Sequence, residues 1–207
     1  MADAIGLIEK AEAVQADLIE VRLDHIKDVR DLADLAAHGK KPKIAADKSS
    51  RSETEQSQML LTAAKSGFEY VDIDLSALQL EDSVREMKAL GTKPVVSFHK
   101  FDGSLSLSEL KSVFEREISS GAEVCKIVTT ANRIEDNLAP LEFTSTVSNK
   151  TKLVCFCMGE LGKISRLLSP LFGGFFTFAA LEQGREPASG QISIQEMKAA
   201  YKLLGQK

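Results

Sequence analysis

The sequence has few of the features that mark membrane, secreted or nucleic-acid-binding proteins. No apolar run approaches the roughly 20 residues needed to cross a bilayer, and the opening MADAIGLIEKAEA lacks the uninterrupted apolar stretch of a signal peptide. Acidic residues outnumber basic ones by 30 to 26, which argues against the concentrated positive charge that nucleic acids and membrane surfaces require. We therefore predict a cytoplasmic protein that binds neither nucleic acid nor membrane.

Cysteine is also scarce. Cys125, Cys155 and Cys157 all lie in apolar, strand-like runs, as expected of small buried side chains in a reducing compartment. The spacing of Cys155 and Cys157 differs from that of a redox C-x-x-C pair, and no neighbouring His or Cys completes a zinc site. We predict no metal ion.

The sequence contains no linker-like or low-complexity stretch, so we predict one domain over residues 1–207. Within it, short apolar runs alternate with segments of helical periodicity at intervals of about 25 to 30 residues, which predicts parallel strands joined by helices. The predicted strands are Asp17–Leu23, Pro42–Ala46, Tyr70–Leu75, Pro94–Phe98, Val124–Val128, Leu153–Phe156 and Gly174–Phe178. Predicted helices include Ala2–Val14, Val29–Ala37, Glu53–Lys65, Leu80–Leu90, Ser106–Ser119 and Ile194–Leu204.

The strands themselves favour a closed (β/α)₈ TIM barrel over an open doubly wound sheet. Charged and branched apolar residues alternate in Ile19–Asp24 and again in Val71–Leu75, whereas central strands of an open sheet are apolar on both faces. No G-x-G-x-x-G motif follows an early strand, which weakens a dinucleotide-binding fold further. Seven strands against eight helices leave the barrel's first β-strand apparently missing, because the sequence opens directly on a helix.

Lys126 is the first candidate for chemistry. It lies near the end of the apolar strand Val124–Val128, where burial penalises an ammonium ion, and a neutral amine can attack a ketone to form an imine. The alternative is a lysine whose tip reaches the barrel mouth and pairs with a carboxylate. His99 also ends a strand and could shuttle protons near neutral pH, although a lone histidine is often structural.

Charged residues at other strand ends predict a binding site for a small polar molecule. Glu20, Arg22 and Asp24 share one strand face, where they form either a ligand-binding network or a purely structural one. Asp74 is placed to orient His99, and Arg166 offers a fork-shaped cation suited to a carboxylate or phosphate. Gly173-Gly174 and the loop 184–191 are expected to complete the mouth.

Six pieces of sequence, in this order and spacing, resemble the type I 3-dehydroquinate dehydratase family over nearly the whole chain. They are A-D-L-I-E-V-R-L-D at 16–24, V-D-I-D-L at 71–75, V-S-F-H-K-F at 96–101, C-K-I-V-T at 125–129, I-S-R-L at 164–167 and F-G-G-F-F-T-F-A-A through S-G-Q at 172–191.

The resemblance implies a shikimate-pathway lyase without a cofactor, which converts 3-dehydroquinate to 3-dehydroshikimate. It implies that Lys126 forms the imine and that His99 shuttles protons. It also implies that the substrate is contacted by Glu20, Arg22, Lys48, Arg166, Ser189 and Gln191, and that the protein is a homodimer.

The sequence departs from the family pattern at three places. Asp74 stands where the family has Glu, and Lys48 stands where it has Arg, which keeps the charge but loses the bidentate fork. Pro187-Ala188-Ser189 replaces the family's S/T-A-P. These departures, with the missing strand, bear on affinity and turnover more than on reaction type.

Two other functions remain open. One is a Schiff-base aldolase on the same barrel, with Arg166 and Gly173-Gly174 binding a phosphate. The other is a barrel that binds a metabolite or a partner without catalysis.

Overall fold

The computed structural model describes residues 2–26, 28–49, 51–182, 184 and 189–206. In these residues eight α-helices and six strands alternate along the chain, as the sequence predicts for an α/β protein. The helices are α1 (Ala2–Ala13), α2 (Leu32–Ala37), α3 (Glu53–Lys65), α4 (Leu80–Ala89), α5 (Leu107–Ser119), α6 (Leu138–Val147), α7 (Lys163–Leu168) and α8 (Ile194–Leu203). The strands are β1 (Ile19–Arg22), β2 (Lys43–Ala46), β3 (Tyr70–Asp74), β4 (Lys93–His99), β5 (Val124–Thr130) and β6 (Lys152–Met158).

The six strands follow one another in chain order in a single sheet, β1-β2-β3-β4-β5-β6. The pairs β1–β2, β2–β3 and β3–β4 are parallel, and their register sets Arg22 beside Ala46 and Asp74 beside Ser97. Six of the seven predicted strands are confirmed, with ends that shift by at most a few residues. Parallel pairing brings the carboxyl ends of β1, β2 and β3 to one edge of the sheet in unit 1, where Arg22 and Asp74 lie.

The seventh predicted strand, Gly174–Phe178, is wrong. These residues are extended, and the amide of Phe175 donates to the carbonyl of Leu153 on β6, at 2.7 Å, but no ladder of strand pairing is formed. Immediately before them Gly173 has φ of +94°, and the Thr177 hydroxyl donates to the backbone carbonyl of Arg166. Side-chain and loop contacts thus hold this segment in place of a full set of inter-strand hydrogen bonds.

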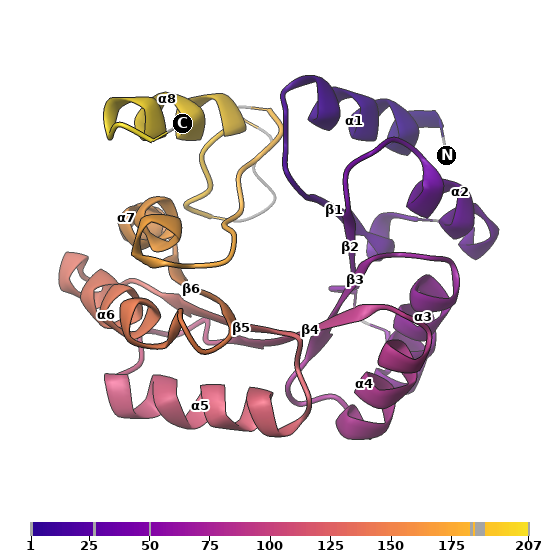
Figure 1. Ribbon diagram of the computed structural model, residues 1–207, viewed down its shortest axis with the longest axis horizontal. Coiled ribbons are helices and arrows are strands. Elements are labelled where there is room, and N and C mark those ends of the chain that lie inside the picture. The colour runs from indigo at the N-terminus through magenta and orange to yellow at the C-terminus, as the bar shows by residue number, and fades with distance from the viewer. Residues whose placement is uncertain (1, 27, 50, 183, 185–188, 207) are drawn as a thin grey trace. The chain divides into compact units, whose positions relative to one another are not determined.

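The chain divides into two compact units, each with its own buried side chains. Unit 1 comprises residues 1–97 and 116–124, and unit 2 comprises residues 98–115 and 125–207. In unit 1 (indigo to magenta in Figure 1), α3 packs on β3 and α4, and buries Leu60, Ala63 and Ala64. The start of α3 is fixed by a capping box between Ser52 and Glu55, which satisfies amides that a helix end otherwise leaves unpaired.

In unit 2, α6 and α7 pack on β6 (orange in Figure 1), and five consecutive residues of that strand, Leu153–Cys157, are buried. All three cysteines are buried and free of disulfides, as predicted. No described helix is long and apolar enough to cross a membrane.

Candidate functional site

Lys126 lies in the middle of β5, and its side chain is almost completely buried, with 4% of the residue exposed. Its Nζ atom lies 4.5 Å from the ring centroid of Phe178, close enough for a cation–π contact when the amine is protonated. Phe178 in turn meets Phe156 and Phe176 edge-on, with centroid distances of 6.3 and 5.4 Å. The amine therefore lies against a cluster of aromatic rings.

His99 is the last residue of β4 and is half-buried. Its ring stacks on that of Phe101 with a centroid distance of 6.0 Å and an interplanar angle of 14°. The next residue, Lys100, donates its amide to the carbonyl of Val128, at 2.9 Å, so the end of β4 is tied to β5 two residues beyond Lys126. His99 and Lys126 thus both belong to unit 2 and come from neighbouring strands, His99 from the carboxyl end of β4 and Lys126 from the interior of β5.

Arg166, on α7, is a buried cation with no ion pair to a carboxylate among the described residues. It is 3% exposed, and its Cζ atom lies 4.5 Å from the ring centroid of Phe156. Burial lowers the pKa of Arg166 to about 10, so the guanidinium is still charged at neutral pH. Its Nε atom is buried and has no hydrogen-bond partner among the described residues. A buried charged fork with an unsatisfied donor is what a binding site for a small anion requires.

The position of α7 is fixed by buried hydrogen bonds of Ser165, the residue before Arg166. The amide of Ser165 donates to the side-chain oxygen of Asn137, at 3.0 Å, and the Ser165 hydroxyl accepts from the amide of Cys157, at 2.9 Å. Asn137 is itself held by the carbonyl groups of Ile134 and Leu161. Arg166 is therefore carried by a rigid helix start, which suits a residue that must bind a ligand in one orientation.

The segment Ser189-Gly190-Gln191 lies against the loop that follows β6. The amide of Gly159 donates to the carbonyl of Ser189, at 3.1 Å. Gln191 has a buried Oε1 atom without a hydrogen-bond partner in the described part of the chain, so this amide is available for a ligand. Ser189 itself is exposed. The predicted departure at Pro187-Ala188 falls outside the described residues.

The backbone at position 190 requires a glycine. It has φ of +75°, and a Cβ atom there would collide with the backbone carbonyl of Gly159. We expect Gly190→Ala to lower the stability by roughly 1–3 kcal/mol and to loosen Gln191. Gly184→Ala is the matched control, because Gly184 has a similar φ of +79° with nothing within 4 Å of its added Cβ. Thermal unfolding of the two variants should separate the effect of the collision with Gly159 from the strain of the left-handed backbone. An equal loss of stability in both variants would contradict the collision.

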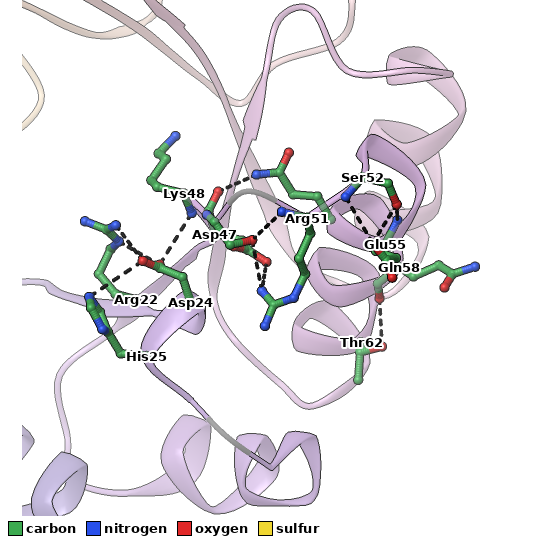
Figure 2. A network of polar contacts seen from close by, with 12 residues as sticks. Arg22, Asp24, His25, Asp47, Lys48, Arg51, Ser52, Glu55, Gln58 and Thr62 are labelled. Carbon is green, nitrogen blue, oxygen red and sulfur yellow. Dashed lines mark hydrogen bonds and ion pairs between the residues drawn. The ribbon is translucent and has the colours of Figure 1, made fainter.

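In unit 1, Arg22 and Asp24 form a bidentate pair at the end of β1 (Figure 2). The Arg22 Nε and Nη2 atoms donate to the two carboxylate oxygens of Asp24 at 2.9 and 2.7 Å. Burial opposes the charge of Asp24, but the hydrogen bond from Arg22 and backbone amides outweigh it, and the pKa of Asp24 is lowered. The hydrogen bond to Asp24 in turn raises the pKa of Arg22. The Arg22–Asp24 part of the predicted network of charges is therefore confirmed, and Glu20 lies half-buried on the same strand as Arg22.

The loop after β2 is fixed by Asp47, whose side chain is fully buried (Figure 2). Its carboxylate accepts from Arg51 and from the amide of Ser49, and its carbonyl accepts from the Gln56 side chain, at 2.7 Å. Between these anchors the amide of Lys48 donates to Asp24, at 3.4 Å. The backbone of Lys48 is thus held from both sides, and its side chain can be directed.

The ammonium group of Lys48 binds Asp72, a residue that sequence reasoning passed over. Its Nζ lies 3.2 Å from the Oδ1 atom of Asp72, which also accepts a hydrogen bond from the Ser97 hydroxyl at 2.6 Å. Burial works against the charge of Lys48, but the carboxylates of Asp72, Glu20 and Asp74 outweigh it, and the pKa of Lys48 is raised. The signal was present in the alternation of Val71–Leu75, which places Asp72 and Asp74 on one face.

Asp74, at the end of β3, has its carboxylate engaged locally. Its Oδ1 atom accepts from the amide and the hydroxyl of Ser76, at 2.9 and 2.6 Å, as in an Asx turn. The predicted orienting of His99 by Asp74 stays a prediction. Among the described residues no group of three or more His, Cys, Asp or Glu side chains is arranged to hold a metal ion.

In unit 2 the structure brings together Lys126, Arg166 and the aromatic rings between them. The order of contacts is Lys126, Phe178, Phe156 and Arg166, each touching the next. Sequence reasoning assigned no role to either phenylalanine, because an aromatic residue in an apolar run is indistinguishable from ordinary core. In unit 1 the structure brings together Arg22, Asp24, Lys48 and Asp72.

Comparison with known proteins places this arrangement in a family. The family model described as type I 3-dehydroquinase matches residues 1–207. A 3-dehydroquinate dehydratase of Methanococcus maripaludis is 31% identical over 98% of this chain and 94% of the relative. A chloroplastic bifunctional 3-dehydroquinate dehydratase/shikimate dehydrogenase of Arabidopsis thaliana is 33% identical over 97% of this chain, which spans 36% of that longer protein.

A solved structure of the 3-dehydroquinate dehydratase from Geobacillus kaustophilus superposes with a TM-score of 0.84 at 25% identity, over 99% of this chain and 85% of that one. The predicted fold class, that of the TIM-barrel dehydratases, is therefore confirmed, while the missing first strand stays a prediction. By fold, by sequence over its whole length and by the matching of a family model, this chain belongs to the type I 3-dehydroquinase family.

Proposed function

We propose that this protein dehydrates 3-dehydroquinate to 3-dehydroshikimate through a Schiff base on Lys126. The observation that carries the proposal is a buried amine linked through two phenylalanine rings to a buried guanidinium, which has no ion pair with a carboxylate in the described part of the chain. An imine needs an amine that can lose its proton, and a substrate acid needs a cation. The names of the relatives, 3-dehydroquinate dehydratases, agree in substrate and reaction.

The reaction would run in three steps. The neutral Nζ of Lys126 adds to the C3 ketone, and loss of water leaves a protonated imine. This imine withdraws electrons, so a proton at C2 can be removed, and the electron pair expels the C1 hydroxyl, which leaves as water once protonated. Water then hydrolyses the imine, which releases 3-dehydroshikimate and regenerates the amine.

His99 is the proposed proton shuttle, because its ordinary pKa lies near neutrality and each of the three steps moves a proton. Arg166 would bind the substrate carboxylate with its planar fork, and Gln191 would close on the substrate through its side-chain amide. In unit 1 we propose Glu20, Arg22 and Lys48 as contacts to substrate hydroxyls.

The remaining roles rest on the resemblance alone. Asp74 would orient His99, and Ser189 would supply a hydroxyl contact next to Gln191. We also propose that the protein acts as a homodimer in the cytoplasm, which sedimentation and fractionation would test.

Borohydride trapping tests the proposal directly. Incubation with 3-dehydroquinate and sodium borohydride should reduce the imine to a stable secondary amine, and peptide mass spectrometry should find the added mass on Lys126. The Lys126→Met variant should take up none. Absorbance of 3-dehydroshikimate should appear with the unmodified enzyme.

Other outcomes contradict the proposal in different ways. An adduct on Lys126 with cleavage of a carbon–carbon bond and no dehydroshikimate absorbance would favour an aldolase. Neither adduct nor product would favour a barrel that only binds a metabolite or partner. Product formed without an adduct would support the dehydration reaction but contradict the imine intermediate on Lys126.

A further inference from the structure

Asp72 is a buried carboxylate on the face of β3 that carries the functional groups. Its side chain is 1% exposed, and an isolated charge at that depth would be costly. Two donors offset the cost: the Lys48 ammonium at 3.2 Å and the Ser97 hydroxyl at 2.6 Å, both on the same oxygen, Oδ1. Ser97 lies on β4 and Lys48 two residues beyond β2, so three consecutive strand segments meet at this atom.

The contact between Lys48 and Asp72 matters because lysine lacks the planar guanidinium of arginine. Lysine has a flexible four-carbon stem and a compact charge, so it does not fix its own direction as the planar guanidinium of arginine does. The Lys48 side chain is 32% exposed, which leaves its tip room to move unless another group holds it. Asp72, itself held by Ser97 and by the parallel pairing of β3 with β4, is a rigid anchor for that tip.

We propose that Asp72 is a positioning residue that acts through Lys48, holding the ammonium charged and aimed so that it can bind a substrate hydroxyl or carboxylate oxygen. The inference rests on the proposed function, in which Lys48 contacts the substrate, and it adds a residue to which neither the resemblance nor the sequence assigned a role. Ser97 supports Asp72 through the hydrogen bond from its hydroxyl.

A double-mutant cycle separates this role from a general structural one. Asp72→Asn should raise KM for 3-dehydroquinate about 10-fold and change kcat less than about threefold, because a ground-state contact is weakened. Lys48→Met should raise KM at least as much. In the Lys48→Met background, adding Asp72→Asn should change KM by less than about twofold, because the residue it acts through is gone. Ser97→Ala should have a smaller effect in the same direction.

A second readout does not depend on turnover. Reductive methylation with ¹³C-formaldehyde labels lysine amines, and the NMR signal of Lys48 is the one lost in Lys48→Met. Carboxylates of Asp72 and Asp74 on β3 and of Glu20 on β1 act on this amine. Its titration midpoint should lie above that of exposed lysines and fall in Asp72→Asn. Glu69→Gln, at an exposed ion pair with Lys93, is the matched control and should leave it unchanged.

Two results would overturn the inference. One is a KM effect of Asp72→Asn that persists undiminished in the Lys48→Met background, since Asp72 would then act elsewhere. The other is a Lys48 midpoint that Asp72→Asn does not move. Failure of the proposed function is distinct from both: the unmodified enzyme would not turn over 3-dehydroquinate, and the substrate role of Lys48 would fall with it, whatever the NMR titration gave.

Discussion

Replacing Lys126 with methionine should reduce turnover of 3-dehydroquinate on the order of 10⁴-fold or more while leaving the protein folded. Methionine keeps an unbranched apolar stem of similar length against Phe178 but has no nucleophilic nitrogen. Removing the covalent step removes the electron sink that makes the C2 proton acidic, and no positioning effect can replace it. The loss should fall on kcat.

The measurement is the appearance of 3-dehydroshikimate absorbance, with thermal unfolding of the same samples to show that the variant is folded. A binding titration with 3-dehydroquinate should still give saturation, because Arg166 is intact. Lys150→Met, at an exposed turn before β6, is the matched lysine control and should keep full activity. Residual activity of Lys126→Met above a few per cent would contradict an essential imine.

The order of the elements could be predicted because each signal is local. Strand alternation at Ile19–Asp24 and the helical periodicity of the segments between strands depend only on neighbouring residues, and six strands and the six helices that were given ranges occur where they were expected. The prediction of a strand at Gly174–Phe178 was wrong because an apolar run indicates burial and does not indicate hydrogen bonding between strands. Phe176 and Phe178 are half-buried and Phe175 is exposed; their rings contact one another and, through Phe178, Phe156 of β6, yet these residues form no ladder.

The site could be predicted as far as residue types at strand ends go. Lys126 stood out because a charge in an apolar strand needs an explanation, and Arg166 because its planar cation suits an anion; both are buried. The interaction partners of the site residues were harder to predict, because they depend on the register between segments that are distant in the sequence. Asp74, chosen over Asp72, has its carboxylate on Ser76 two residues away, and Asp72 is the one that reaches Lys48. Both carboxylates share a strand face, and only tertiary structure distinguishes them.

Replacing Arg166 with methionine should weaken substrate binding and stabilise the empty protein at the same time. Loss of the cation should raise KM on the order of 10²–10³-fold, because truncating one side of a buried charge pair costs about 2–5 kcal/mol. In the empty protein, however, the guanidinium is buried, its Nε atom has no hydrogen-bond partner among the described residues, and the face of Phe156 compensates only part of the cost of burying its charge.

The depressed pKa of Arg166, about 10, expresses the same penalty. A base whose folded pKa lies below its unfolded value destabilises the fold at every pH below the folded pKa, and the penalty is relieved only as the pH rises above about 10. At neutral pH the cost is therefore fully present, and Arg166→Met should raise the unfolding temperature of the empty protein. Conversely, 3-dehydroquinate should raise the unfolding temperature of the unmodified protein and not that of the variant.

Arg166→Lys distinguishes charge from shape. Lysine keeps the cation but loses the fork and its stacking on Phe156, so KM should rise less than in Arg166→Met, with no gain in stability. A variant Arg166→Met that was less stable than the unmodified protein, with KM unchanged, would mean that the arginine serves packing alone. Stability gained and affinity lost together would identify Arg166 as a cation maintained in a buried position for a ligand that brings the opposite charge.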